Sequence, residues 1–537
     1  MILSTLLTPS ITPQTLLMIW MALPFLAGFY IYLLSKSALA GANRSLSPSW
    51  PGIVVKGVSV GDRLFALAVT LVSLIYGLSR LLSPETLDLQ LLDQFGVSLL
   101  IDSLSGYLIV TNALVTAAVI LYSWAKGKGA FFYTQVTILL GSVNAVFICA
   151  DFISLYVALE VISVAAFLLM AHPRTDRSIW VGLRYLLVSN TAMLFYLMGA
   201  VLVYQHNQSF AFEGLGNAPT EAIALIFLGL LTKGGIFVSG LWLPLTHAES
   251  DTPVSALLSG AVITTGVFPL VRCALLVESV LPTLTVFSTA TAIFGVVYAI
   301  RESDTKRMLA ASTISQLGFV LANPPVAGMY ALTHGLAKAS LFLIAGNLPS
   351  RKFRELRQKP IPTALWLALA LASLSISGFP LLAGFEAKTM TLKTLSGWQG
   401  ITMNIASVGT AIAFAKFIFL PHSSTPKSST SKSNNGLWLA IALLLIALLA
   451  LNTLYSQAYS FTAVTKALIT IATGWLLYRL GANALHRSTA PPIPGSPAPA
   501  LPINPSLTLL MKKAEHMDHL IGAMSLVLTL LFWMVLA

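Results

Sequence analysis

The sequence predicts an all-α membrane protein that crosses the bilayer many times. Hydrophobic residues make up 56% of the 537 residues and charged residues only 9%, whereas about a quarter of the residues in a soluble domain are charged. Apolar runs of about 20 residues, each long enough to cross a hydrocarbon layer of about 30 Å, recur from end to end. Composition therefore excludes a soluble enzyme, a disordered chain and a nucleic-acid-binding protein.

Sixteen apolar segments are expected to cross the membrane. The first segment follows a start that lacks the basic region and the small-residue cleavage site of a signal peptide, so it is expected to remain as a helix. The segments cover residues 14–34, 63–82, 103–123, 131–150, 152–171, 179–204, 221–243, 253–277, 281–300, 307–325, 326–348, 362–392, 398–420, 436–455, 461–480 and 518–537.

Basic residues lie almost entirely in alternate loops. The loops after odd-numbered spans hold 22 Lys and Arg residues, and the loops after even-numbered spans hold only Arg80 and Lys393. The positive-inside rule makes the odd loops cytoplasmic, so both termini are predicted to lie outside. The net charge of +12 thus reports orientation and not a nucleic-acid partner.

Two polar segments are expected to lie outside the bilayer. Residues 421–435 form a Ser/Thr-rich linker, and residues 488–506 are Pro-rich, which is typical of an extended arm on the cytoplasmic face. The two cysteines, Cys149 and Cys273, both lie in apolar runs. The sequence therefore predicts neither a disulfide framework nor a metal cluster.

Seven basic residues remain inside the predicted spans, where a charge costs on the order of 2.5–3.5 kcal/mol on insertion scales. Arg184, Arg272 and Lys466 lie close to span ends, which favours snorkelling or structural pairing, and Lys416 leaves both interpretations open. The deep ones are Lys233, Lys338 and Lys388. These three are candidates for function.

Glycine and proline residues interrupt two of the spans that carry a deep lysine. Gly234 and Gly235 follow Lys233 directly, and Gly378 and Pro380 precede Lys388. Such residues predict broken helices whose freed backbone groups line a polar cavity. One broken helix in each half of the chain indicates a transporter built from inverted repeats.

Three further ionisable residues accompany the lysines. His334 lies four residues before Lys338, so both project from one helix face, which favours a proton relay over a hydrogen-bonded core histidine. Glu160 and Glu386 are the only deep acids. A carboxylate beside a buried lysine titrates with it as a unit, and a static structural ion pair is the alternative for Glu160.

Four stretches of the sequence match a known family in the expected order. The chain resembles the proton-conducting membrane transporters, which comprise the antiporter-like subunits of complex I-type NAD(P)H:quinone oxidoreductase and the large subunits of Mrp-type Na⁺/H⁺ antiporters. The resemblance spans roughly residues 95–420. It is carried by TKGGIFVSGLWLPLTHAESDTPVSALLSG (232–260), ESDTKRMLAASTISQLGFV (302–320), THGLAKASLFLIAG (333–346) and SGFPLLAGFEAKTM (377–390).

The resemblance implies about fourteen core helices in two inverted five-helix repeats with two discontinuous helices, followed by extra C-terminal helices. The implied divisions are N-terminal helices in residues 1–130, a first repeat in 131–277, a second repeat in 281–420 and C-terminal helices with linkers in 421–537. The chain would lie in a bacterial-type plasma membrane, a thylakoid membrane or another energy-transducing membrane.

The resemblance also implies roles for individual residues. Glu160 matches the glutamate that pairs with the lysine of the first broken helix, here Lys233. Lys388 matches the lysine of the second broken helix, the exit-side proton site, and His334 and Lys338 match the connecting residues. Many relatives carry a base in the eighth helix, where this chain has hydroxyl residues that can bind a water chain, and Glu386 is a candidate modulator of Lys388. The hydroxyl residues are Ser259, Thr264 and Thr265.

The leading hypothesis is a proton-translocating subunit of a Mrp-type monovalent cation (Na⁺)/H⁺ antiporter, closest to its D-type subunit. The alternatives are the antiporter-like subunit of a complex I-type oxidoreductase and a scaffold that lost conduction with the eighth-helix base. Each implies other membrane subunits as partners, the lipid bilayer around the chain, and protons, with Na⁺ in the antiporter. No catalytic residue, metal ligand or cofactor is expected in this chain.

Overall fold

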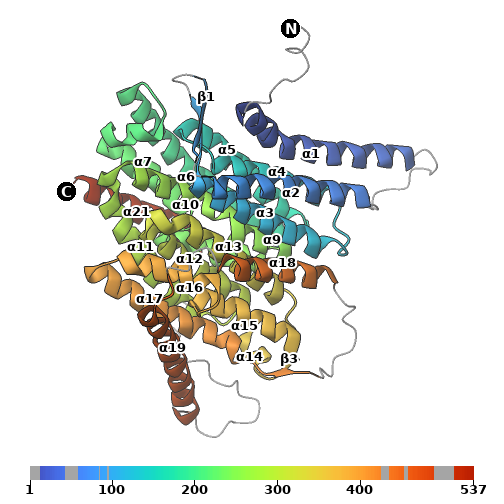
Figure 1. The fold of residues 1–537 in the computed structure, drawn as a ribbon, viewed down its shortest axis with the longest axis vertical. Helices are drawn as coiled ribbons and strands as arrows, with labels where there is room; N and C mark the ends of the chain where they lie inside the picture. Colours follow the sequence, from blue (N-terminus) through green and yellow to red (C-terminus); the bar gives the residue numbers. More distant parts are fainter. Residues whose placement is uncertain are drawn as a thin grey trace.

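The computed structural model describes residues 13–42, 59–83, 85–92, 96–424, 435–452, 458–488 and 513–536. Within them, 11 helices are long and apolar enough to cross a membrane, and three shorter apolar helices accompany these. The helices lie side by side in a single stack (Figure 1). The predicted all-α membrane fold is confirmed.

The N-terminal part of the stack consists of long uninterrupted helices. It begins with α1 and α2, which Figure 1 places at one end of the molecule. Asp102 and Asp151 are the N-caps of α3 and α5, where each carboxylate accepts a backbone N–H, as expected at a helix start. The elements are α1 (Pro13–Ala42), α2 (Val60–Leu82), α3 (Ser103–Ser123), α4 (Ala130–Val146), α5 (Phe152–Ala171) and α6 (Asp176–Asn207).

A β-hairpin between α2 and α3 was not predicted from the sequence. Strand β1 (Leu87–Leu92) pairs in antiparallel register with β2 (Gly96–Ile101). An isolated antiparallel β-bridge joins Leu99 of the hairpin to Cys149, which follows α4. It therefore ties the loop before α3 to the loop before α5.

The seventh predicted span is broken, as the glycines indicated. Helix α7 (Thr220–Lys233) ends at Lys233, and the chain continues through the short helix η3 (Phe237–Trp242) into α8 (Leu243–Glu249). Gly235 takes a φ of +67° at the break, and a Cβ there would lie 2.0 Å from Leu243 Cδ1. Only glycine fits this turn without strain.

The eighth predicted span is also irregular, which the sequence did not predict. Helix α9 (Thr252–Leu257) passes into a π-helical segment, η4 (Leu258–Val262), before α10 (Thr264–Leu276) resumes the regular hydrogen bonding. Such π segments occur frequently at functional sites.

The second half of the stack repeats this pattern. Helix α15 ends at Gly378, whose φ of +83° makes the turn, and α16 carries Lys388. The predicted second break is therefore present. The elements are η2 (Phe212–Asn217), η5 (Glu278–Val280), α11 (Leu281–Arg301), α12 (Thr305–Ala322), η6 (Pro324–Val326), α13 (Ala327–Ala345), α14 (Phe353–Leu356), β3 (Ile361–Pro362), α15 (Thr363–Ser377), α16 (Ala383–Thr394), α17 (Gly397–Ile418) and β4 (His422–Ser423).

Three C-terminal helices return to different parts of the stack. Helix α18 (Asn435–Leu451) packs on α3 and α13, α19 (Phe461–Ser488) packs on α17, and α21 (Met517–Leu536) packs on α7 and η3. Figure 1 shows α19 and α21 at separate places on the molecule. The predicted polar linker and Pro-rich arm lie largely outside the described residues.

A buried charged cluster anchors the start of α21. Glu515 pairs with the Arg307 guanidinium and accepts a hydrogen bond from the Tyr298 hydroxyl. The backbone oxygen of Glu515 accepts a 2.5 Å hydrogen bond from Arg184. Arg184, for which the sequence left snorkelling and pairing open, thus has a structural partner.

Two other basic residues inside the spans also have structural partners. Lys416 donates to the carbonyl oxygens of Ala299, Ile300 and Glu302 at 3.0, 2.6 and 2.8 Å. Because these carbonyls end α11, Lys416 caps that helix with a cation. Arg272 forms a two-pronged ion pair with Asp102, with N···O distances of 2.5 and 3.0 Å.

Removing one partner of the Arg272–Asp102 pair is expected to destabilise the fold. Arg272→Ala would leave the Asp102 carboxylate without its partner at the start of α3, which costs about 3 kcal/mol for a buried pair. The measurement is the thermal unfolding midpoint of the purified protein, with exposed Arg354→Ala as the matched control. Equal midpoints for the two variants would contradict a stabilising role.

Candidate functional site

The Lys233 side chain ends in a cluster of hydroxyl groups. Its ammonium donates to Ser163 Oγ, to Ser189 Oγ at 2.6 Å and to the Leu159 carbonyl oxygen at 3.3 Å. The two serine hydroxyls are themselves 3.1 Å apart. Lys233 lies at the last residue of α7, where the helix breaks, and only 5% of its surface is exposed. A buried lysine is thus joined to α5 and α6 through groups that both donate and accept protons.

Glu160 lies one helical turn before Ser163 on α5. The Glu160–Lys233 pair is not among the ion pairs found within 4.0 Å in the described residues. Glu160 Oε1 is buried and has no hydrogen-bond partner there. The structure therefore brings Lys233 to the same part of α5 through Ser163, and the direct pairing of Glu160 with Lys233 remains a prediction.

Lys338 and His334 share one face of α13, as their spacing predicts. Lys338 is fully buried, and its ammonium donates to the Leu309 carbonyl oxygen at 2.8 Å and to Ser312 Oγ, both on α12. Both ring nitrogens of His334 are buried without a hydrogen-bond partner among the described residues. A histidine in this state can accept a proton from one side and pass one on from the other.

The three hydroxyl residues of the eighth span have local partners. Ser259 lies in the π segment and shares a 2.9 Å hydrogen bond with Thr313 of α12. Thr264 and Thr265 each donate to a carbonyl oxygen three residues earlier, at 2.6 Å. Ser259 alone of the three connects to the helix that holds Lys338, and the water-chain role of all three remains a prediction.

A second buried histidine, His247, was missed by the sequence analysis. His247 lies on α8 with no exposed surface, within the apolar stretch Thr220–Glu249 that is long enough to cross a membrane. Its ring is 5.8 Å from Phe342, one turn after Lys338 on α13. On the other side, its ring is 6.4 Å from Trp242.

An aromatic row leads from His247 back to Lys233. Trp242 lies 5.3 Å from Tyr185, and the Lys233 ammonium lies 5.7 Å from the Tyr185 ring. The indole N–H of Trp242 donates to the Thr232 carbonyl oxygen beside Lys233. His247 thus lies between the environments of Lys233 and Lys338.

A small polar cavity separates His334 from the second broken helix. It has a volume of about 10 Å³, close to the ~10–15 Å³ that one water molecule needs. Its lining includes Gln316, Tyr330, His334, Ser375 and Ile376. The Lys388 ammonium donates to the Ile376 carbonyl oxygen at 3.1 Å, so the lysine of the second break is hydrogen-bonded to a residue that lines this cavity.

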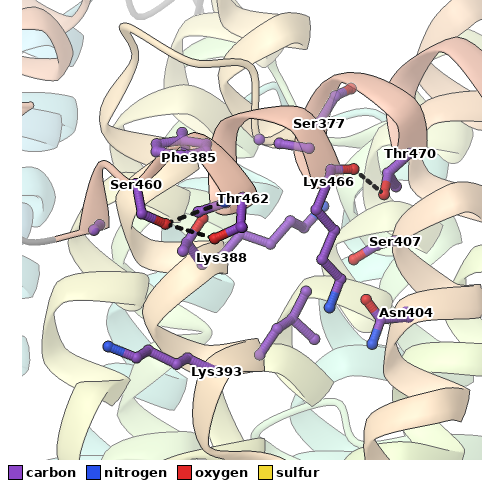
Figure 2. A pocket seen from close by; sticks show the side chains of 16 residues that line it. Ser377, Phe385, Lys388, Lys393, Asn404, Ser407, Ser460, Thr462, Lys466 and Thr470 are labelled. Atoms are coloured by element: carbon purple, nitrogen blue, oxygen red, sulfur yellow. Dashed lines mark hydrogen bonds between the residues drawn. The ribbon is translucent and has the colours of Figure 1, made fainter.

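Lys388 lies at the wall of a much larger cavity. This cavity has a volume of about 280 Å³ and lies between α16, α17 and α19. Figure 2 shows the side chains that line it, including Lys388, Ser407 and Lys466. Lys388 therefore lines the large cavity and is hydrogen-bonded to Ile376, a residue of the small one.

Glu386 is fully buried in the first turn of α16. Residues two apart on a helix point in different directions, so Glu386 and Lys388 do not share a face, and a modulating role for Glu386 remains a prediction. The part of the chain that the structure describes contains no group of three or more His, Cys, Asp or Glu residues that could hold a metal ion.

Residues at both breaks adopt a backbone conformation that side chains rarely take. Phe237 has a φ of +53° after the first break, and Leu381 has a φ of +74° after the second. Such conformations cost about 1–3 kcal/mol each and cluster at functional sites. Lys233 and Lys388 therefore both lie close to residues with a strained backbone conformation.

Comparison with known proteins places this arrangement in a family. Residues 149–413 match the transmembrane domain of NADH:quinone oxidoreductase and Mrp antiporters. The chain is 29% identical to NAD(P)H-quinone oxidoreductase chain 4 1 of Synechococcus elongatus, over 58% of this chain and 65% of that protein. It is 25% identical to the D-type subunit of the Na⁺/H⁺ antiporter of Alkalihalophilus pseudofirmus, over 59% of this chain and 70% of that one.

Solved structures share the fold. A chain of the Mrp complex from Dietzia sp. superposes with a TM-score of 0.68 at 20% identity, covering 86% of this chain and 98% of that one. A chain of an archaeal membrane-bound sulfane sulfur reductase superposes with a TM-score of 0.70 at 17% identity and the same coverage. Residues 149–413 of this protein therefore belong to the family of transmembrane domains found in NADH:quinone oxidoreductases and Mrp antiporters.

Proposed function

We propose that this chain is the proton-translocating subunit of a Mrp-type monovalent cation (Na⁺)/H⁺ antiporter. Protons would pass along a buried row formed by Glu160, Lys233, His247, His334, Lys338 and Lys388. The proposal rests on one observation above all. Five of these groups, all except Glu160, are buried basic side chains on four different helices, α7, α8, α13 and α16.

Hydroxyl groups, aromatic rings and a small cavity lie between successive ionisable residues of this row. Ser163 and Ser189 accept hydrogen bonds from Lys233, and Ser163 lies one helical turn from Glu160 on α5. His247 lies between Lys233 and Lys338. His334 lines the cavity of about 10 Å³ together with Ile376, whose carbonyl oxygen accepts a hydrogen bond from Lys388. Each lysine ammonium of the row donates to oxygen atoms of hydroxyl and carbonyl groups, so a proton can leave it without breaking an ion pair.

The position of His247 argues against a non-conducting scaffold. That alternative arises because the eighth span carries hydroxyl residues where many relatives have a base. His247 supplies a titratable ring on α8, between the two lysine sites. A neutral imidazole accepts a hydrogen bond at one ring nitrogen and donates one at the other, so the row has a base in the interval where the eighth span has none.

The cytoplasmic end of the route would lie near Lys306. Its ammonium donates to the Ser250 carbonyl oxygen at 3.0 Å and to Ser255 Oγ at 3.4 Å. Ser255 in turn donates to the backbone oxygen of His247 at 2.7 Å. Lys306 belongs to a loop that the distribution of basic residues predicts to be cytoplasmic, so protons would reach the row there and leave past Lys388.

The second candidate is an antiporter-like subunit of a complex I-type NAD(P)H:quinone oxidoreductase. The relatives at 29% identity favour it, since two of them are oxidoreductase subunits from Synechococcus elongatus and Desulforudis audaxviator. The relative from Alkalihalophilus pseudofirmus supports the antiporter. Both candidates require neighbouring membrane subunits, and both use the same buried row.

Subunit composition separates the two candidates. The experiment tags this chain, extracts the native complex in mild detergent and identifies its components by mass spectrometry. Co-purification of small hydrophobic subunits alone is the expected result for an ion-gradient-driven antiporter. Recovery of iron–sulfur and quinone-site subunits would instead show a redox-driven pump, and the antiporter proposal would be wrong.

A further inference from the structure

The large cavity beside Lys388 is lined by three lysines, of which Lys388 is buried and Lys393 and Lys466 are exposed. Lys388, Lys393 and Lys466 all line it, and no Asp or Glu of the described residues does. Figure 2 shows Lys388 on α16 and Lys466 on α19 beside the cavity, and Lys393, also on α16, with its ammonium on the side away from Lys466. Neither Lys393 nor Lys466 forms an ion pair within the part of the chain that the structure covers. The cavity therefore carries uncompensated positive charge.

Neutral hydrogen-bonding groups and apolar side chains such as Phe385 and Leu392 complete the lining. Ser407 and Asn404 contribute from α17, and Ser460, Thr462 and Thr470 contribute from the start and first half of α19. The volume of about 280 Å³ is close to the lower end of the ~300–1,000 Å³ that hold small ligands. Ammonium and hydroxyl donors without a carboxylate suit an anionic oxygen ligand such as a phosphate group.

Helix α19, which forms one wall of the cavity, faces the lipid. Helix α19 is apolar, and only 17% of the residues in its most apolar 18-residue stretch are buried in the molecule. Large side chains such as Phe461, Ile469 and Leu476 are 86, 61 and 58% exposed. A ligand in this cavity can thus place an anionic head among the lysines while its apolar part lies along α19.

The cavity is also lined by residues at the ends of two helices. Lys393 is in the last turn of α16, and Ser460 and Thr462 flank the first residue of α19. The distribution of basic residues predicts that both of these ends face outward. Lysine side chains at helix ends reach the interface in this way.

We propose that this cavity binds the headgroup phosphate of an anionic phospholipid through Lys393 and Lys466. The binding is independent of whether the chain moves protons. It assigns a function to α19, which lies outside the matched family domain of residues 149–413. The lipid would fill the open side of the cavity next to Lys388.

The test counts phospholipids on the purified complex by native mass spectrometry. We compare the wild type, a Lys393→Gln/Lys466→Gln double variant, and a Lys352→Gln/Lys359→Gln control that changes two exposed lysines elsewhere. The double variant is expected to lose one anionic phospholipid per chain, and the control to lose none. Thermal unfolding midpoints establish that both variants are folded.

A second arm identifies the source of the phosphate. Delipidated complex in phosphatidylcholine nanodiscs is titrated either with phosphatidylglycerol or with inorganic phosphate, and the shift in unfolding midpoint is recorded. Phosphatidylglycerol is expected to stabilise the wild type and to bind the double variant roughly thirtyfold more weakly, at ~1 kcal/mol per lysine. Equal stabilisation by inorganic phosphate would show a free-anion site and overturn the lipid assignment.

Two other results would also overturn the proposal. One is an unchanged count of anionic phospholipids in the double variant. The other is the loss of a neighbouring protein of the complex from the double variant while its lipid content stays constant, which would assign the cavity to a protein partner.

Discussion

Lys233→Ala is expected to abolish coupled proton transport while the complex still assembles. The substitution removes the ionisable side chain at the break of α7, so the hydroxyls of Ser163 and Ser189 lose the ammonium that they accept from. Removing a proton-transfer group slows transfer by about a hundredfold or more. The measurement is proton flux in proteoliposomes, with blue-native gels to establish assembly.

Lys233→Arg is the matched control for this first prediction. Arginine keeps the positive charge but does not release its proton in proteins. If Lys233 exchanges protons, the arginine variant assembles normally and is as inactive as the alanine variant. Full activity with arginine would show that only a fixed charge is needed, and the transfer role of Lys233 would be wrong.

Lys388→Ala is expected to cause a loss of similar size at the other end of the row. The substitution removes the lysine that lines the cavity of about 280 Å³ and donates to Ile376, a residue of the small cavity beside His334. Among the described residues no other lysine donates to the Ile376 carbonyl oxygen, so the proton has no carrier across this interval. Flux in proteoliposomes again measures the loss.

The large cavity provides a distinguishing test for Lys388. A small amine such as ethylamine can enter that cavity and replace the missing ammonium, so added ethylamine is expected to restore part of the flux in the Lys388→Ala variant. Lys338 is fully buried and lines none of the cavities described above, so Lys338→Ala is expected to stay inactive under the same treatment. Rescue of both variants, or of neither, would contradict the assigned geometry.

Much of the fold could be predicted because its signals are local. Apolar runs of about 20 residues identify the spans, since the bilayer fixes the length that a helix needs. The glycines after Lys233 and before Lys388 identify both breaks, since a turn inside the membrane needs a residue that accepts positive φ. These features depend on a few neighbouring residues, and the structure contains them.

His247 was missed because a broken span is longer than an unbroken one. The predicted seventh span ended at residue 243, which is where α8 begins. Residues 234–242 form the break between the two halves of the span. The second half-helix therefore extends beyond a segment of about 20 residues. His247 therefore looked like a loop residue, although Pro244 at the start of α8 was a signal of a new helix.

The surroundings of Glu160 and Lys233 could not be predicted either. They depend on the rotation and packing of α5, α6 and α7, which no local sequence pattern specifies. Ser163 and Ser189 meet Lys233 only in the folded chain. The β-hairpin and the π segment likewise depend on tertiary contacts, such as the bridge from Leu99 to Cys149.

The central claim is that one continuous buried row carries protons through this chain, and Lys338 in its middle gives the most direct test. The measurement is the rate at which purified complex in proteoliposomes moves protons under an imposed ion gradient, followed with a pH-sensitive dye. The account predicts clear flux for the wild type and a loss of about a hundredfold or more for Lys338→Ala. Equal flux in the two samples, with equal amounts of assembled complex, would contradict it.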